Sequence, residues 1–199
     1  MTAAPLEALL AEARACTHCA DLPLGPRPVL RAAASARLLI IGQAPGTRVH
    51  ASGVPWDDRS GDRLRQWLDL DRDVFYDESR IAIIPTGLCY PGRDPKGGDL
   101  PPRPDCAPLW HPRLLAALPD IALTLLVGSH AQAFHLKGRR AASLTETVRA
   151  WRDYGPALLP LPHPSWRTNH WEKQNPWFAA ELLPALRDRL RTLLSGVAG

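Results

Sequence analysis

The four cysteines are the residues whose type and spacing most directly suggest chemistry. Cys16 and Cys19 form a C-x-x-C pair, and Cys89 and Cys106 are separated by 16 residues of loop-forming sequence. Four thiolates suit either a tetrahedral zinc ion or an iron–sulfur cluster, and their spacing favours neither, although a zinc ribbon more often has two C-x-x-C pairs. The alternative is a set of buried thiols or a redox pair. Two disulfides are not expected in a chain without an export signal.

Three other segments hold residues that suit binding or catalysis. The turn GQAPG (42–46) is shaped by glycine and proline, so its backbone amides can face a ligand. GVPWDDRSGDRL (53–64) places two aspartates after Trp56, and HPS (163–165) places a histidine before a proline. Trp56 can stack on a flat ligand or pack in the core. His163 can act as a neutral hydrogen-bond donor or be an ordinary loop histidine.

Alternating strands and helices are predicted to position these segments. Short apolar runs predict buried strands over residues 36–41, 80–86, 121–128 and 157–162. Apolar residues at helical spacing, such as Leu109, Leu114 and Leu115 in the third segment, predict helices over residues 5–16, 60–71, 106–118, 129–136, 143–152 and 176–194. We therefore predict an α/β fold, a three-layer α/β/α sandwich around a four-stranded parallel sheet, as one domain over residues 1–199. Ligands bind beyond the carboxyl ends of such strands, where all the segments above lie.

Composition limits the classes of function. The chain has 199 residues, 45% of them hydrophobic and 22% charged, which is typical of a globular protein and excludes wholesale disorder. No apolar run approaches the roughly 20 residues of a membrane span. The net charge of +4 mildly favours an anionic partner. We expect a cytoplasmic monomer that does not bind a membrane.

The motifs in this order resemble the uracil-DNA glycosylase superfamily, and within it the iron–sulfur branch of bacteria and archaea. That branch reads G-E-x-P-G, then G-x-P-F-x-G-x-(A/S)-G-x-x-L, then a strand ending near a cysteine, then HPS. The resemblance runs from Cys16 to about Pro176. It implies a DNA repair glycosylase that flips uracil, or a related deaminated base, out of DNA and hydrolyses its N-glycosidic bond. It also implies a 4Fe-4S cluster on the four cysteines, with one structural zinc ion as the alternative.

The resemblance assigns roles to the first turn and to two aromatic residues. The turn from Gly42 is implied to bind the base, with the Gln43 backbone in contact with it. Ala44 stands where another branch has a water-activating aspartate, and Gly46 where that branch has a tyrosine that excludes the thymine methyl group. Trp56 matches a phenylalanine that stacks on uracil. His163 matches a histidine that donates to the uracil O2 as negative charge develops there.

Two positions depart from the family pattern or leave a choice open. Pro85 stands where the family keeps an asparagine that reads the Watson–Crick edge, and Thr86 could replace it if the register shifts by one. Either Asp57 or Asp58 could orient the attacking water, or the two could cap the next helix near Ser60. With Gln43 and His163, Asp58 completes the predicted catalytic set.

The resemblance also implies a DNA-binding surface. Ser165, Trp166 and Arg167 belong to a loop that fills the gap left by the flipped base, although ordinary loop packing is the alternative. Ser129 and His130 open a helix whose amino end suits a phosphate. LKGRR (136–140) is a basic cluster that suits DNA or solvent.

Three readings follow for the function. The first is removal of uracil from DNA. The second is removal of another base such as hypoxanthine, because Pro85 lacks the expected reading group. The third is a non-catalytic nucleic-acid-binding protein with a structural metal.

Overall fold

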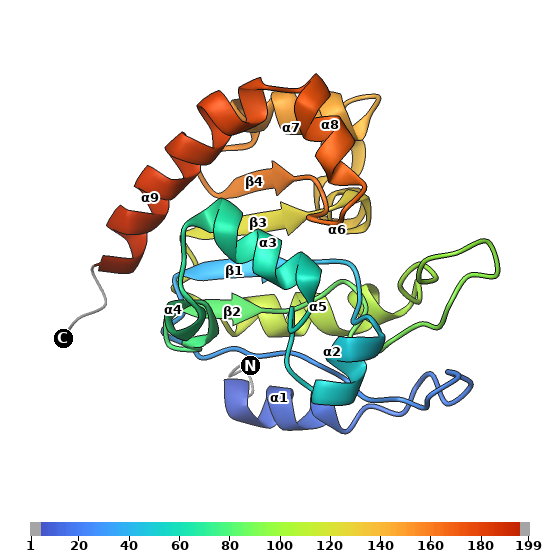
Figure 1. Ribbon diagram of the computed structural model, residues 1–199. Coiled ribbons are helices and arrows are strands. Elements are labelled where there is room, and N and C mark those ends of the chain that lie inside the picture. Colours follow the sequence, from blue (N-terminus) through green and yellow to red (C-terminus); the bar gives the residue numbers. More distant parts are fainter. Residues whose placement is uncertain (1–4, 196–199) are drawn as a thin grey trace.

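The computed structural model describes residues 5–195 (Figure 1). Its strands are β1 (Leu38–Ile41), β2 (Ile81–Ile83), β3 (Leu123–Val127) and β4 (Leu158–Leu161). Its α-helices are α1 (Leu6–Arg14), α2 (Thr47–Ser52), α3 (Arg59–Leu68), α4 (Arg72–Tyr76), α5 (Cys106–Ala116), α6 (Ser129–Leu136), α7 (Leu144–Arg149), α8 (Thr168–Gln174) and α9 (Leu183–Ser195). Shorter helical turns are η1 (Lys137–Arg139), η2 (Trp151–Tyr154) and the π-helical η3 (Phe178–Leu182).

The four strands form one parallel sheet in the order β2-β1-β3-β4. Side chains alternate along each strand, so Leu38 and Ile40 of β1 face one layer and Leu39 and Ile41 the other. The first layer comes from α3, α4 and α9, and the second from α1, α5 and α6. In Figure 1, α3 crosses in front of the sheet and α5 lies behind it. The predicted three-layer sandwich with a four-stranded parallel sheet is confirmed.

The helices differ from the sequence-based expectation in extent and phase. The predicted helix over 143–152 ends at Arg149 and continues as η2, and the one over 176–194 starts as η3 before α9. In α5, Leu109 was expected in the core but is 41% exposed, because the helix buries Trp110, His111 and Leu114 instead. Three short helices, α2, α4 and α8, lie in segments for which no helix was predicted.

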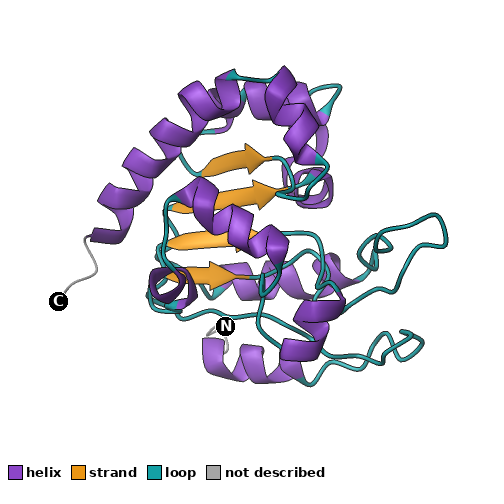
Figure 2. Cartoon of the chain, viewed as in Figure 1, coloured by secondary structure: helices purple, strands orange, loops and turns teal. Residues whose placement is uncertain are grey.

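The long loops leave the sheet at the carboxyl ends of the strands, beyond the arrowheads in Figure 2. Pairing between β1 and β2 continues past the strands into this region. The backbone N–H groups of Thr86 and Gly87 donate to the carbonyl oxygens of Gly42 and Gln43, at 2.9 and 2.7 Å. The hydrogen bonding of the sheet thereby continues into the 42–46 turn, which the sequence predicts to be a ligand site. No helix described in residues 5–195 is long and apolar enough to cross a membrane.

Candidate active site and cysteine pocket

A solvent-open cavity of about 530 Å³ lies beyond the carboxyl end of β1. Its walls come from the 42–46 turn, the segment before α3, and the residues that follow β2 and β4. Gln43, Ala44, Trp56 and His163 all line it. The walls mix apolar and polar groups, as the walls of small-molecule sites do. Residues predicted from distant motifs therefore meet at one cavity.

Trp56 is held in this cavity by two glycines. Its backbone has a left-handed φ of 58°, which is rare for a large side chain and recurs at functional sites. A Cβ atom on Gly42 would lie 2.6 Å from the Trp56 ring, and one on Gly61 would lie 1.7 Å from its carbonyl oxygen. The ring centroids of Trp56 and His163 are 5.7 Å apart. Gly42 thus leaves room for the indole ring of Trp56, and Gly61 leaves room for its backbone.

His163 faces the cavity from the segment after β4 and is half-buried. Burial lowers the pKa of His163 to about 4, with a smaller contribution from nearby His130 and an opposing one from Asp58. The Thr168 hydroxyl and the Ser165 backbone N–H donate to the His163 carbonyl oxygen and fix its backbone. The imidazole is therefore neutral at physiological pH and can donate one hydrogen bond into the cavity.

The two aspartates after Trp56 have different surroundings. Asp58 is the N-cap of α3, where its Oδ1 accepts from the Gly61 backbone N–H at 2.8 Å, and it also lines the cavity. Asp57 forms an ion pair with Arg72 at 2.8 Å, and that arginine lowers the pKa of the Asp57 carboxyl group. Helix capping, one of the two predicted roles, is therefore present at Asp58. Asp57 does not line the cavity.

The structure brings Pro85 to the cavity but not Thr86. Thr86 is buried, and its hydroxyl donates to the Gly42 carbonyl oxygen at 2.7 Å. The prediction that Thr86 contacts the base is therefore not supported, because its side chain is engaged in joining the two loops. The Pro85 carbonyl oxygen accepts from Nε2 of buried His111 at 3.0 Å, which fixes the cavity floor from behind.

Asp99 lines the cavity and was missed in the sequence. It lies in the long loop between β2 and α5, far along the chain from the recognised motifs. Burial raises the pKa of its carboxyl group, as does Asp58, whereas Arg93 lowers it. A single acidic residue after two glycines, in a loop at the carboxyl edge of the sheet, was the only signal available.

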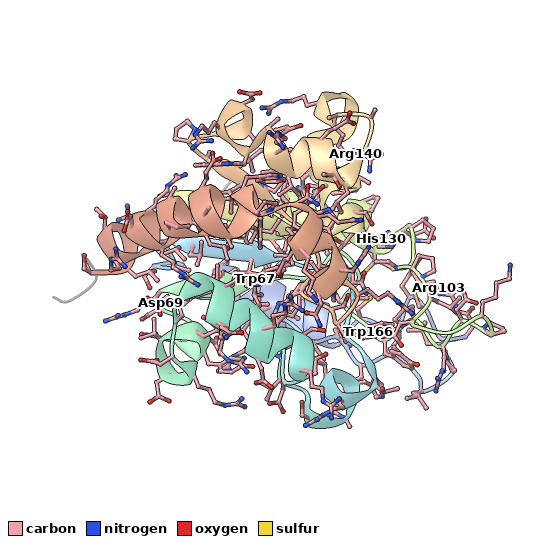
Figure 3. The ribbon with its side chains drawn as sticks, turned by 45° about the horizontal axis from the view of Figure 1, so that its top comes forward. Trp67, Asp69, Arg103, His130, Arg140 and Trp166 are labelled. Atoms are coloured by element: carbon pink, nitrogen blue, oxygen red, sulfur yellow. The ribbon has the colours of Figure 1, made fainter. Side chains whose placement is uncertain are left out.

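The predicted DNA-binding residues lie beside the mouth of the cavity. Trp166 is 74% exposed, with the Arg167 guanidinium 5.3 Å from its ring centroid. Figure 3 shows Trp166 and His130 on the side of the molecule that carries the long loop with Arg103, whereas Asp69 lies at the other end of α3. Ser129 is exposed and Ser165 is half-buried, and in LKGRR only Leu136 is buried. An exposed apolar ring next to a guanidinium suits insertion into DNA.

A clamp that sequence reasoning missed holds the Trp166 loop. The Arg63 guanidinium of α3 donates to the Ser165 carbonyl oxygen, to Asn169 and to Glu172 of α8. The ion pair with Glu172 measures 2.6 Å and is largely buried. The loop is thus fixed to the same helix that carries the Asp58 cap.

A second pocket, of about 410 Å³, is lined by all four cysteines. Cys16 and Cys19 come from the segment after α1, Cys89 from the loop after β2, and Cys106 from the first residue of α5. The Leu88 backbone N–H donates to the Cys106 sulfur at 3.2 Å, and burial raises the pKa of the Cys89 and Cys106 thiols to about 11. Within residues 5–195, no three or more His, Cys, Asp or Glu side chains are grouped as they would be around a single metal ion.

Comparison with known families agrees with this arrangement. The sequence matches the family described as the Uracil DNA glycosylase superfamily over residues 30–187. The matched region contains all four strands, the cavity with Trp56 and His163, and the Trp166 loop. The chain therefore belongs to the uracil DNA glycosylase superfamily.

Proposed function

We propose that the protein removes uracil from DNA by hydrolysing the bond between the base and C1′ of the sugar. The observation that carries this proposal is the neutral His163 imidazole, which lines the same cavity as the Trp56 indole with its ring centroid 5.7 Å from that of the indole. A flat apolar ring and one neutral donor are what a flipped pyrimidine with a carbonyl group requires.

Bond cleavage places negative charge on the departing base and positive charge on the sugar. A donor aimed at a carbonyl oxygen of the base stabilises the first charge, and a preorganised donor in a half-buried site costs little to reorient. His163 has this character because its backbone is fixed by Thr168 and Ser165. The backbone of the 42–46 turn supplies the opposite wall, and its glycine leaves room for the Trp56 ring.

The Trp166 loop supplies the contact with the duplex. Flipping a base leaves a gap in the stack, and an exposed aromatic ring can fill it while a neighbouring cation meets the phosphates. Trp166 and Arg167 have these properties, and the Arg63 clamp holds them beside the cavity.

We also propose that Cys16, Cys19, Cys89 and Cys106 hold a 4Fe-4S cluster. A zinc ion about 2.3 Å from each sulfur would need the four sulfurs within roughly 4 Å of one another. A cluster attaches its cysteines to different iron atoms and so suits thiols spread around a pocket. The apolar lining and the N–H donor to Cys106 also fit such a group. It would tie the segment after α1 to the loop after β2 and has a structural role.

The direct test is cleavage of an oligonucleotide that carries one uracil, with alkali converting the abasic product into a strand break. We expect cleavage at uracil and none at thymine in the matched control. DNA binding without cleavage of any base would instead indicate a non-catalytic binding protein. Action as a monomer in the cytoplasm stays a prediction.

Pro85 in the cavity favours one second candidate. It offers no side-chain group to read the edge of the base, so a base such as hypoxanthine could also be accepted. A panel of oligonucleotides with uracil, hypoxanthine or thymine at one position decides between the two substrates.

A further inference from the structure

Two carboxylates border the part of the cavity beside Ala44 and Gly46 of the 42–46 turn. Ala44 and Gly46 present only a methyl group and a hydrogen. A Cβ atom built on Gly46 would lie 3.3 Å from Oδ2 of Asp99 and 4.0 Å from Oδ2 of Asp58. The space beside Gly46 is therefore bordered by Asp58 and Asp99, and hydrolysis needs a base for the attacking water.

Asp58 is the weaker candidate for that base. Its Oδ1 already accepts the Gly61 N–H at the amino end of α3. One of its two carboxylate oxygens is therefore engaged in the helix cap and is not free to accept a proton from water. Its second role, as the cap of the helix that carries Arg63, also restricts its movement.

Asp99 has the properties that Asp58 lacks. In the part of the chain that the structure describes, no hydrogen bond acts on its carboxyl group, and the charges that act on it are those of Arg93 and Asp58. The residue is exposed at the rim of the cavity, so water reaches it, yet partial burial of the carboxyl group raises its pKa. A carboxylate that is accessible and more basic than usual is suited to accept a proton.

We propose that Asp99 is the general base of the hydrolysis, an inference that rests on the proposed glycosylase function. In this step the water oxygen bonds to C1′ of the sugar, and the bond from C1′ to the base breaks with its electron pair moving to the base. One water proton passes to the Asp99 carboxylate, while His163 stabilises the base anion. The carboxyl group then returns the proton to the base or to solvent.

The loop that carries Asp99 adjoins the DNA-binding loop. It is a small hairpin closed by an antiparallel bridge between Arg93 and Asp99 and by the Asp94 backbone N–H, which donates to the Gly98 carbonyl oxygen. A Cβ on Gly98 would lie 3.7 Å from the Arg167 guanidinium. Docking of DNA against Arg167 would therefore cover the hairpin as well and bring the sugar of the flipped nucleotide near Asp99.

The test is single-turnover cleavage of uracil-containing DNA by Asp99→Asn, Asp58→Asn and Asp120→Asn. General-base catalysis typically contributes about 10²–10⁴-fold, so Asp99→Asn is expected to lose at least about 100-fold with DNA affinity unchanged. Asparagine is also a good helix cap, so Asp58→Asn keeps α3 intact and should lose far less. Asp120→Asn removes the same charge from a distant exposed turn before β3 and should match the parent.

Two further readouts separate a base from a merely structural residue. The parent rate should fall as acid protonates Asp99, whose pKa is raised mainly by burial and further by Asp58, against the effect of Arg93, and this fall should be absent in Asp99→Asn. Added formate should partly restore the activity of Asp99→Ala, because it supplies a small carboxylate.

If the parent cleaves uracil and Asp99→Asn keeps its rate, the proposal is overturned. A loss of DNA affinity equal to the loss of rate, or a larger loss in Asp58→Asn, also overturns it. A parent that cleaves no uracil refutes the proposed function instead.

Discussion

Trp56 and His163 line the same cavity, but in the proposed reaction they would act at different stages. Stacking on Trp56 would hold the flipped base before the bond breaks, whereas a hydrogen bond from His163 would strengthen as charge develops on the base. Their ring centroids are 5.7 Å apart, so substitutions at the two positions test two adjacent parts of one cavity.

We expect His163→Ala to slow single-turnover cleavage of uracil by about 10²–10³-fold, the usual cost of removing one transition-state donor. DNA affinity should stay nearly unchanged, because most of it comes from phosphate contacts. Trp56→Ala is the matched comparison and should weaken binding to uracil-containing DNA together with the rate. A His163→Ala variant that cleaves at the parent rate would show that another group stabilises the charge.

At the scale of elements, α3 connects the cavity to the Trp166 loop. Asp58 caps its amino end, and Arg63 one turn later holds the Ser165 carbonyl oxygen and Glu172. The Trp166 loop is thus held at a defined distance from the cavity, which a wedge into DNA requires.

Replacing both Trp166 and Arg167 by alanine should reduce cleavage of double-stranded substrate much more than of single-stranded substrate. The reason is that only the duplex has a stack to open. The measurement is the cleavage rate on each of the two substrates. The control is Arg59→Ala, at an exposed position in the first turn of α3. Equal losses on both substrates would mean that the loop only packs or contacts the backbone.

At the scale of the whole molecule, the cysteine pocket joins the amino-terminal segment to the rest of the fold. If it holds a 4Fe-4S cluster, protein purified without oxygen should be brown, with broad absorbance near roughly 400 nm and matching iron and sulfide contents. Cys106→Ser should lose the colour and melt at a lower temperature, because the tie between the loops is lost. A colourless protein with one zinc ion would contradict the cluster, and free thiols without metal would contradict both metals.

Two half-buried histidines make the stability of the fold sensitive to acid. The pKa values of His135 and His163 are lowered to about 4, whereas an unfolded histidine titrates near about 6.5. Between these values the unfolded chain binds protons that the folded chain does not, so the folded state loses stability as pH falls. We expect the melting temperature to fall from about pH 6.5 towards pH 4, and more gently in His163→Gln. A melting temperature independent of pH in this range would refute the burial of both neutral rings.

Local patterns in the sequence determined the frame of this protein. Four short apolar runs had to be buried on both faces, and alternation with helices left only a parallel sheet between two helical layers. Connections at the carboxyl edge then placed the 42–46 turn, Trp56 and His163 near one another. The motifs also hold the glycines that make room for Trp56, although only the structure shows that Gly42 faces its ring and Gly61 its backbone.

Only the tertiary structure decided which polar groups reach the cavity. Thr86 and Pro85 are neighbours in the sequence, yet a hydrogen bond to Gly42 holds the threonine hydroxyl away while the proline lines the wall. Asp99 and the Arg63 clamp depend on contacts between segments far apart in the chain, which neither periodicity nor spacing encodes. Loop side chains are placed by such long-range contacts rather than by local propensity, so the sheet was predictable and the full set of groups at its edge was not.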